Sequence, residues 1–318
     1  MAVARPLPVG QLETRLVACD LDGTLLDPTG SVRPAVRAAV AAVRAAGVRV
    51  VIATGRSGWA VAEVARTLGL PGRHIVMNGG AYMSPLTGRV TWARRLTGET
   101  VRDALAFARG LGAVPLLGFT DTHVCARAGR RSAAMPEFVT DTHLRIVESL
   151  ADYADRGPVR VYVPTLASEH ARAVAEAREW FEGRASIVYG DETGFEVMAL
   201  GTNKGEALRA VAASMGLTRA DVAAMGDGPN DREMLAWAGR SAALVPAPEA
   251  PVVRGRVLAE ATVVAPSCAR DGAIDALRSF FPGLDGLEPR LRSAERPRVE
   301  ARSRVPARRP GVANESAA

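Results

Sequence analysis

Lysine and asparagine are almost absent from this 318-residue sequence. Of its 40 Lys and Arg residues, 39 are Arg, and Lys204 is the single lysine. Asparagine occurs only at Asn78, Asn203, Asn230 and Asn314. This usage draws attention to the few positions that keep these residues. Arginine has not replaced lysine at Lys204, and another small residue has not replaced asparagine at the four positions above.

Cysteine is scarce as well. Cys19, Cys125 and Cys268 are too few and too scattered for a disulfide framework or a zinc site, so we expect them to be small buried hydrophobic residues. No apolar run reaches the ~18 residues that a membrane span needs. Residues 1–10 also lack the charged-then-apolar pattern of a secretory signal. We therefore expect a cytoplasmic protein without a membrane partner.

Positive charge is in excess, but it is concentrated near the C-terminus. The net charge is +6, and eight Arg against four Glu in residues 286–318 account for +4 of it. The rest of the chain gives little reason to expect a nucleic-acid partner. The 286–318 tail has no hydrophobic periodicity and is expected to be disordered. Length and a hydrophobic content of 48% allow two domains with a large core, but they leave the oligomeric state open.

A short apolar run followed by two carboxylates is the most informative stretch. Residues 16–19 are typical of a buried parallel strand and are followed by Asp20, Asp22, Gly23 and Thr24. Ligands of open α/β sheets bind beyond the carboxyl ends of strands, and alternate residues share a face, so both carboxylates should face one crevice. They could hold Mg2+, or one could attack phosphorus while the other transfers protons. An ordinary Asp-Gly turn explains these residues equally well.

Strands and helices alternate along most of the chain. Strands are predicted at 16–19, 48–53 and 75–77, with helices at 33–46 and 59–68, which indicates a doubly wound parallel sheet. The rhythm changes to short antiparallel strands with helices and then resumes at residue 204. We therefore expect an α/β, Rossmann-like core carrying an inserted α+β cap. The predicted parts are an extension at 1–14, a core at 15–84 and 197–285, a cap at 85–196 and the tail.

Four polar clusters follow predicted strands or open a helix of the core. All should face one crevice, where they would supply a nucleophile, a metal site, a hydroxyl donor and a cation, the equipment of phosphoryl transfer. Their members are Asp20, Asp22, Thr54, Lys204, Asp227, Asn230 and Asp231.

The motifs that contain these residues resemble a known family. DLDGTLL from Asp20, TGR from Thr54, the lone Lys204 before a Gly-x-x-Leu helix and GDGPND from Gly226 stand in the order of the haloacid dehalogenase-like phosphatases. The long insertion between the second and third motifs is similar to the Cof-type subgroup, which has an α+β cap. The resemblance extends from about Arg15 to Phe281.

The resemblance implies a covalent mechanism. Asp20 would be the nucleophile that forms an aspartyl-phosphate, and Asp22 would protonate the leaving oxygen and then activate water. Mg2+ would be held by a side-chain oxygen of Asp20, the backbone carbonyl of Asp22 and the side chain of Asp227.

The resemblance also implies a phosphate site. Thr54 and the Gly55 amide would hold phosphoryl oxygens, Lys204 would neutralise them, and Asn230 would help to bind phosphate. Asp231 would orient Lys204 or metal-bound waters. Each residue also has a structural interpretation: Thr54 as a helix N-cap, Lys204 as a solvated surface residue, and Asp231 as a favourable charge at a helix N-terminus.

Other polar residues have weaker claims. Asn78, Gly79 and Gly80 are expected to form only the hinge turn into the cap, and Arg56 to pack or pair locally. Three cap residues are candidates for substrate contact: Asp121, His123 and Arg160. The turn at Pro246, Ala247 and Pro248 departs from the Gly-Asn-Ala-like turn of the subgroup, which affects local geometry rather than activity.

Together these features predict a Mg2+-dependent phosphatase for small phosphomonoesters, such as a sugar phosphate or a related phosphorylated metabolite. One alternative is a phosphomutase, which would keep Asp22 but return the phosphoryl group to its substrate. Another is a sensor that binds a phosphometabolite without turnover, although such a protein needs no nucleophile. An NAD-binding protein is disfavoured because no Gly-x-Gly-x-x-Gly follows the first strand.

Overall fold

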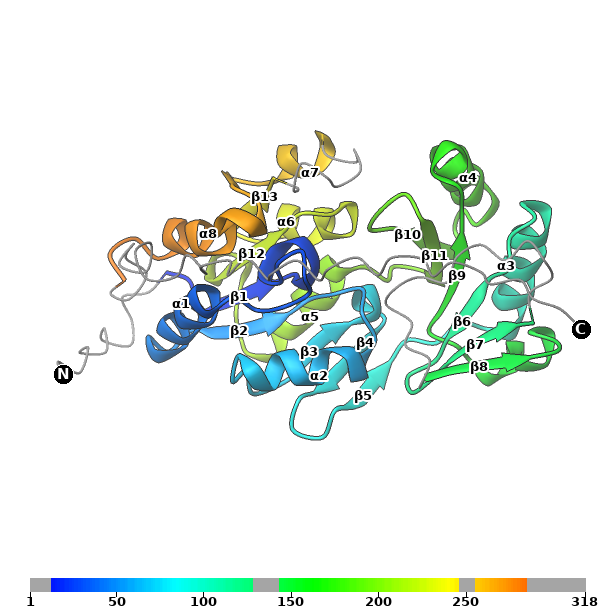
Figure 1. Ribbon diagram of the computed structural model, residues 1–318, viewed down its shortest axis with the longest axis horizontal. Coiled ribbons are helices and arrows are strands. Elements are labelled where there is room, and N and C mark those ends of the chain that lie inside the picture. Colours follow the sequence, from blue (N-terminus) through cyan, green and yellow to red (C-terminus); the bar gives the residue numbers. More distant parts are fainter. Residues whose placement is uncertain (1–12, 128–142, 246–254, 285–318) are drawn as a thin grey trace, which may run out of the picture. The chain divides into compact units, whose positions relative to one another are not determined.

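The computed structural model describes residues 13–127, 143–245 and 255–284 (Figure 1). Three regions discussed above lie outside these residues: most of the 1–14 extension, the turn at Pro246, Ala247 and Pro248, and the 286–318 tail.

A five-stranded parallel sheet forms the core, in the order β14-β13-β12-β1-β2. Strand β1 lies between β12 and β2, with Cys19 opposite Met225 on one side and Ile52 on the other. The carboxyl ends of these strands therefore meet at one edge. The strands are β1 (Leu16–Cys19), β2 (Arg49–Ile52), β12 (Val222–Gly226), β13 (Arg240–Leu244) and β14 (Val263–Ala265).

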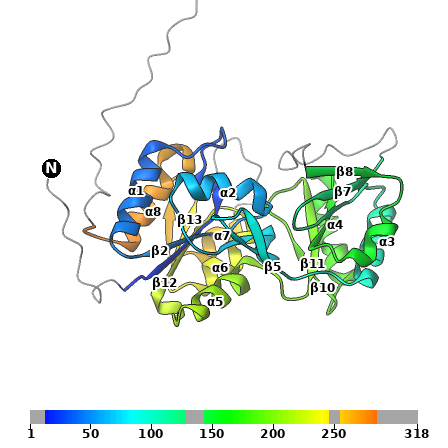
Figure 2. The same cartoon turned by 90° about the horizontal axis from the view of Figure 1, so that it is seen from below.

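Helices cover both faces of this sheet. Val17 and Cys19 of β1 pack with residues of α1 and α8, whereas Leu16 and Ala18 pack with α5, α6 and α7 on the other face. Figure 2 shows α1 and α8 on one side of the sheet and α5 and α6 on the other. The helices are α1 (Pro34–Ala45), α2 (Gly58–Thr67), α5 (Lys204–Ser214), α6 (Arg232–Trp237), α7 (Gly255–Glu260) and α8 (Gly272–Phe280). The predicted doubly wound core is confirmed.

A small antiparallel sheet extends the core beyond β2. It consists of β3 (His74–Val76), β4 (Ala81–Ser84) and β5 (Arg89–Ala93), and a parallel bridge from Ala53 to Ile75 links it to β2. Because β5 pairs with β4, the expected cap boundary at residue 85 falls inside this sheet, between β4 and β5.

The inserted α+β part is built on a six-stranded sheet in the order β10-β11-β9-β6-β7-β8. Its strands are β6 (Leu116–Gly118), β7 (His123–Ala126), β8 (Leu144–Val147), β9 (Arg160–Pro164), β10 (Ala185–Val188) and β11 (Gly194–Ala199). The expected boundary between residues 196 and 197 lies within β11, the strand that leads back to the core. Strand β8 and helix α7 were not predicted from the sequence.

One face of this sheet carries helices α3 and α4. Val161 of β9 and Phe195 and Val197 of β11 pack with α3 (Gly98–Gly110) and α4 (Ala167–Trp180) in a separate hydrophobic cluster. Alternation along a strand then directs Arg160 and Glu196 to the opposite face. Two polar side chains of the cap are thus placed away from its own core.

The three cysteines are free and buried, as expected. Within the described ranges, no helix combines the length and apolar character needed to cross a membrane. The cytoplasmic location stays a prediction.

Candidate active site

The side chains of Asp20 and Lys204 meet at the carboxyl end of β1. The Lys204 Nζ lies 2.6 Å from Oδ1 of Asp20 and 2.7 Å from Oδ1 of Asp231. Lys204 opens α5, where Oδ1 of Asn203 caps the helix by accepting the Glu206 N–H at 2.7 Å. Burial alone would lower the pKa of Lys204, but the two carboxylates outweigh burial and hold that pKa above its usual value. The side chain has 0% exposure, so the solvated-surface interpretation of Lys204 is wrong.

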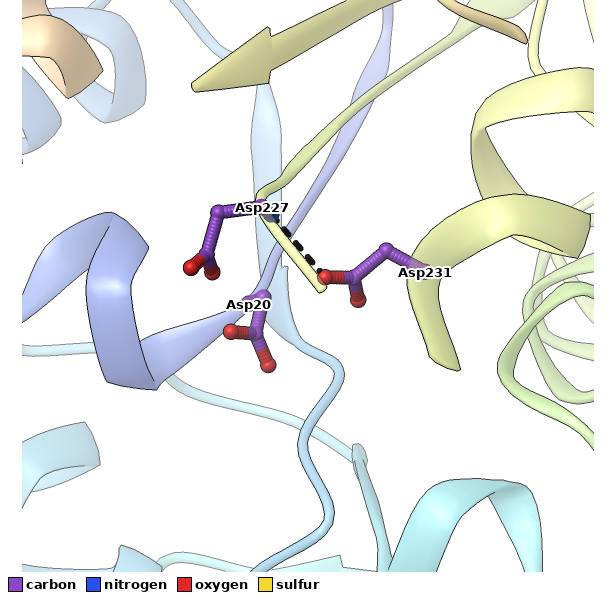
Figure 3. Close-up of side chains that lie close together, drawn as sticks. All are labelled: Asp20, Asp227 and Asp231. Carbon is purple, nitrogen blue, oxygen red and sulfur yellow. Dashed lines mark hydrogen bonds between the residues drawn. The ribbon is translucent and has the colours of Figure 1, made fainter. Parts of the chain in front are cut away.

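The loop after β12 is organised around Asp231. Its Oδ2 accepts the backbone N–H of Asp227 at 3.0 Å (Figure 3). The same oxygen accepts the backbone N–H of Gly228 at 3.0 Å, while Oδ1 binds Lys204. A Cβ on Gly226 would lie 2.3 Å from Cγ of Asp231, so this close approach requires glycine. Both oxygens of Asp231 are thus engaged in holding Lys204 and the loop.

Three carboxylates gather at this edge. Asp20, Asp227 and Asp231 each offer an oxygen, and these oxygens lie within 4.8 Å of one another (Figure 3). Burial, reinforced by Asp231, raises the pKa of Asp227 to about 7 against the opposing effect of Lys204. Burial also raises the pKa of Asp20, and the neighbouring carboxylates add to this effect while Lys204 opposes it.

This donor set fits a hard divalent cation. The buried carboxylates of Asp20 and Asp231 and the partly buried carboxylate of Asp227 face one ammonium, and a cation would offset their remaining repulsion. Carboxylate oxygens are the ligands that Mg2+ prefers. Because both oxygens of Asp231 are already engaged, Asp20 and Asp227 are the residues that would hold the ion by their side chains.

Asp22 follows β1 but lies beyond the end of the strand. The strand ends at Cys19, and Asp22 lies in the following turn (Leu21–Leu25), where Gly23 has φ 74°, so the alternation of a strand no longer directs its side chain. Its side chain is 57% exposed and forms a two-pronged ion pair with Arg56. The sequence predicts only local packing or pairing for Arg56, but its partner is a candidate catalytic residue.

The loop after β2 carries Thr54 and Gly55. Thr54 is 1% exposed, and its hydroxyl accepts the Arg56 N–H at 3.2 Å. Helix α2 begins at Gly58 with Ser57 in the N-cap position, so Thr54 is not the helix cap. The buried hydroxyl lies in the loop that also carries Arg56.

A polar network that the sequence does not predict lies beside this loop. Asn78 donates from Nδ2 to Oε2 of Glu196 at 2.9 Å, and its Oδ1 accepts Nδ2 of Asn230 at 2.9 Å. Glu196 is paired with Arg160, which also donates to the Gly55 carbonyl oxygen at 2.8 Å. Asn78, expected only as part of a hinge, therefore connects the cap to the candidate phosphate site. The scarcity of asparagine was the signal that could have identified it.

The cap candidates for substrate contact are placed in two ways. Arg160 and His123 are buried and contact the core, with His123 Nε2 3.1 Å from the Ser57 hydroxyl oxygen. Asp121 lies exposed between β6 and β7. The structure thus brings together Asp20, Lys204, Asp227 and Asp231. Their chemical roles, and those of the other site residues, stay predictions.

Comparison with known proteins agrees with this geometry. Residues 17–277 match the family model of the haloacid dehalogenase-like hydrolases. The chain belongs to this family. The family and the enzyme class predicted from the motifs, a phosphatase of the haloacid dehalogenase-like type, are therefore confirmed.

Individual relatives are distant but similar in length. The HMP-PP phosphatase of Cronobacter sakazakii is 29% identical over 236 residues, which cover 71% of this chain and 82% of that protein. A solved haloalkanoate-superfamily phosphatase from Bacteroides thetaiotaomicron has a TM-score of 0.70 at 22% identity, covering 87% of this chain and 99% of that one. A solved subclass IIB sugar phosphatase has a TM-score of 0.68 at 20% identity, covering 84% and 99%. These two structures show a shared fold.

Proposed function

We propose that this protein is a Mg2+-dependent phosphatase that hydrolyses small phosphomonoesters through an aspartyl-phosphate on Asp20. The observation that carries the proposal is the contact between Lys204 and Oδ1 of Asp20 at 2.6 Å. Oδ2 of Asp20 accepts no hydrogen bond from the residues described. One oxygen is therefore anchored by a buried cation and the other is left to attack phosphorus.

In the first step, Oδ2 of Asp20 forms a bond to phosphorus while the bond to the leaving oxygen breaks. Asp22 gives a proton to that oxygen. In the second step, Asp22 takes a proton from water, and the resulting hydroxide attacks phosphorus and releases Asp20 and inorganic phosphate. Lys204, the Thr54 hydroxyl and the Gly55 amide hold the phosphoryl oxygens in both steps.

When bound, Mg2+ would neutralise charge on the phosphoryl oxygens and on the attacking carboxylate. Asp20 and Asp227 would hold it by their side chains and Asp22 by its backbone carbonyl. Thr24, whose hydroxyl donates to Oδ1 of Asp227 at 3.2 Å, orients that carboxylate.

The relatives support small phosphorylated metabolites as the substrate class. They include an HMP-PP phosphatase and a sugar phosphatase, so sugar phosphates and other small phosphorylated metabolites are the first compounds to test. The decisive experiment measures phosphate release from such a panel, with and without Mg2+, by wild type and Asp20→Asn.

Asp20→Asn should lose turnover on the order of a thousandfold or more, because an amide cannot replace the nucleophile. Exposed Asp152→Asn is the matched control and should behave as wild type. Near-normal release by Asp20→Asn would overturn the covalent mechanism. Binding without release by wild type would indicate a sensor, and transfer to a second position of the same substrate would indicate a phosphomutase.

A further inference from the structure

The buried network of Arg160, Glu196 and Asn78 has no role in the steps above. These side chains are 1%, 5% and 4% exposed, although all three are polar. Arg160 on β9 and Glu196 on β11 share the face of the cap sheet opposite its helices, and the register pairs Tyr162 with Glu196 and Arg160 with Met198. Buried polar groups of this kind are costly unless every partner is matched, so their arrangement is informative.

The hydrogen-bonding chemistry determines which way each amide points. Arg160 can only donate and the Glu196 carboxylate can only accept, so Glu196 takes Arg160 on Oε1 and must receive an N–H of Asn78 on Oε2. The Oδ1 of Asn78 then faces Asn230, which must present its own Nδ2, at 2.9 Å. One N–H of Asn230 is used in this contact, and the same amide nitrogen carries a second N–H.

Asn78 is held firmly enough to transmit this orientation. Its backbone N–H donates to the Thr54 carbonyl at 3.0 Å, and its φ of 51° is a left-handed conformation that asparagine tolerates. A Cβ on Gly55 would lie 3.1 Å from both terminal atoms of the Asn78 amide. At Gly79, with φ 91°, a Cβ would lie 2.2 Å from the Asn203 carbonyl oxygen. The turn is thus enclosed by the Thr54 loop and the start of α5.

We propose that Glu196 is a positioning residue of the phosphate site: through Asn78 it directs an N–H of Asn230 toward the phosphoryl group. This inference rests on the proposed function, because it assigns a role in binding the phosphoryl oxygens. Arg160 completes the device by occupying one oxygen of Glu196 and by donating to the Gly55 carbonyl at 2.8 Å. The cap thereby orients two parts of the phosphate site without touching substrate: the Gly55 peptide through Arg160, and the Asn230 amide through Glu196 and Asn78.

Glu196→Gln tests the polarity directly. The amide has one acceptor oxygen, which Arg160 takes, so its NH2 group faces Asn78. Asn78 must then flip, Asn230 must flip in response, and an oxygen replaces the N–H aimed at phosphate. We expect kcat/KM and the affinity for inorganic phosphate to fall about ten- to a hundredfold, the value of a hydrogen bond to a charged group.

Asn78→Asp in the Glu196→Gln background should restore both kcat/KM and the affinity for inorganic phosphate. The introduced glutamine then donates to one oxygen of the introduced carboxylate while Asn230 donates to the other, and the net charge of the network returns to that of wild type. Asn78→Asp alone should be defective, because two carboxylates face each other. This reciprocal rescue distinguishes amide polarity from a general loss of packing.

Asn230→Ala supplies the second criterion. If Glu196 acts through Asn230, adding Glu196→Gln to Asn230→Ala should change phosphate affinity less than about twofold. Exposed Glu182→Gln is the matched control and should behave as wild type. Calorimetric binding of inorganic phosphate to the Mg2+-loaded full chain is the common measurement, so the inference is tested even if wild type releases no phosphate.

Two results would overturn the proposal. One is a phosphate affinity of Glu196→Gln within twofold of wild type. The other is an equal loss of phosphate affinity when Glu196→Gln is made in wild type and in Asn230→Ala. Should Glu196→Gln fail to fold, the double variant with Asn78→Asp is compared with wild type. Recovery of fold and phosphate affinity supports the polarity argument, and failure of either contradicts it.

Discussion

The guanidinium of Arg56 binds both carboxylate oxygens of Asp22, with Nε 2.8 Å from Oδ2 and Nη2 2.5 Å from Oδ1. Two parallel hydrogen bonds orient a carboxylate more strictly than one. In the first step of the proposed cycle, Asp22 must leave this pair to deliver a proton to the leaving oxygen. In the second step, the paired carboxylate is already oriented to take a proton from water. Arg56 thus favours the second step.

Arg56→Ala should lower turnover about tenfold, because Asp22 loses its fixed orientation for the attack of water. The melting temperature should hardly change, since a pair in which Asp22 is 57% exposed contributes little stability. Single-turnover and steady-state phosphate release, with a melting curve, measure both effects. Exposed Arg37→Ala is the matched control. Unchanged turnover would show that Arg56 only packs beside Asp22.

Lys204→Arg should lower turnover about a hundredfold, the size of a lost electrostatic contact in a dry site. The Nζ lies 2.6 Å and 2.7 Å from two carboxylate oxygens, and this narrow position suits a compact ammonium rather than a wide planar fork. Because the side chain is completely buried, the larger guanidinium should also destabilise the fold, by about 1–3 kcal/mol.

Urea unfolding and phosphate-release assays separate the two effects of Lys204→Arg. Activity is measured at a temperature where the variant is fully folded. Turnover within threefold of wild type, with chemistry shown to be rate-limiting, would mean that any cation serves at this position. The scarcity of lysine in this chain would then say nothing about the role of Lys204.

The core could be predicted because its signals are local. The apolar run at Leu16–Cys19 is followed at once by Asp20, and the helix that Lys204 opens has its Asn203 cap next to it in sequence. Parallel strands bring their carboxyl ends to one edge, so Asp20, Lys204 and Asp227 could be placed together before the structure was known.

The rest depended on contacts between distant segments. Asn78 and Glu196 are 118 residues apart, and no periodic pattern marks either as a partner of the other. Strand alternation could not direct the Asp22 side chain, because β1 ends at Cys19 and Asp22 lies in the turn that follows. The cap boundary predicted at residue 85 separates β4 from β5. Their pairing depends on main-chain hydrogen bonds, which composition does not reveal.

Asp227→Asn should raise the Mg2+ concentration for half-maximal activity at least about tenfold, because the ion loses a charged ligand. Without Mg2+ the same change should raise the melting temperature, since it removes one of three carboxylates whose oxygens lie within 4.8 Å of one another. Melting curves and activity are compared over a Mg2+ titration. If Asp227→Asn melts at a lower temperature than wild type in EDTA, repulsion in this cluster is already compensated. If Asp227→Asn needs no more Mg2+ than wild type, Asp227 does not belong to the metal site.

His74 should make the protein less stable as the pH falls from about 7 to 5. This side chain has 0% exposure; its Nδ1 accepts the Ile52 N–H at 3.2 Å, and its Nε2 lies 3.3 Å from the Leu70 carbonyl oxygen. These partners suit a neutral ring, and burial lowers the pKa of His74 to about 4 from the ordinary 6.5. Between these two values the unfolded chain binds a proton that the native protein excludes, so stability is lost as the pH falls, by about 2 kcal/mol at pH 5.

Urea unfolding at pH 7 and pH 5 measures this difference, and His74→Asn should reduce it by about the same amount while costing stability at both values. An equal pH dependence in the variant and in wild type would show that His74 takes up its proton in the native state as readily as in the unfolded chain.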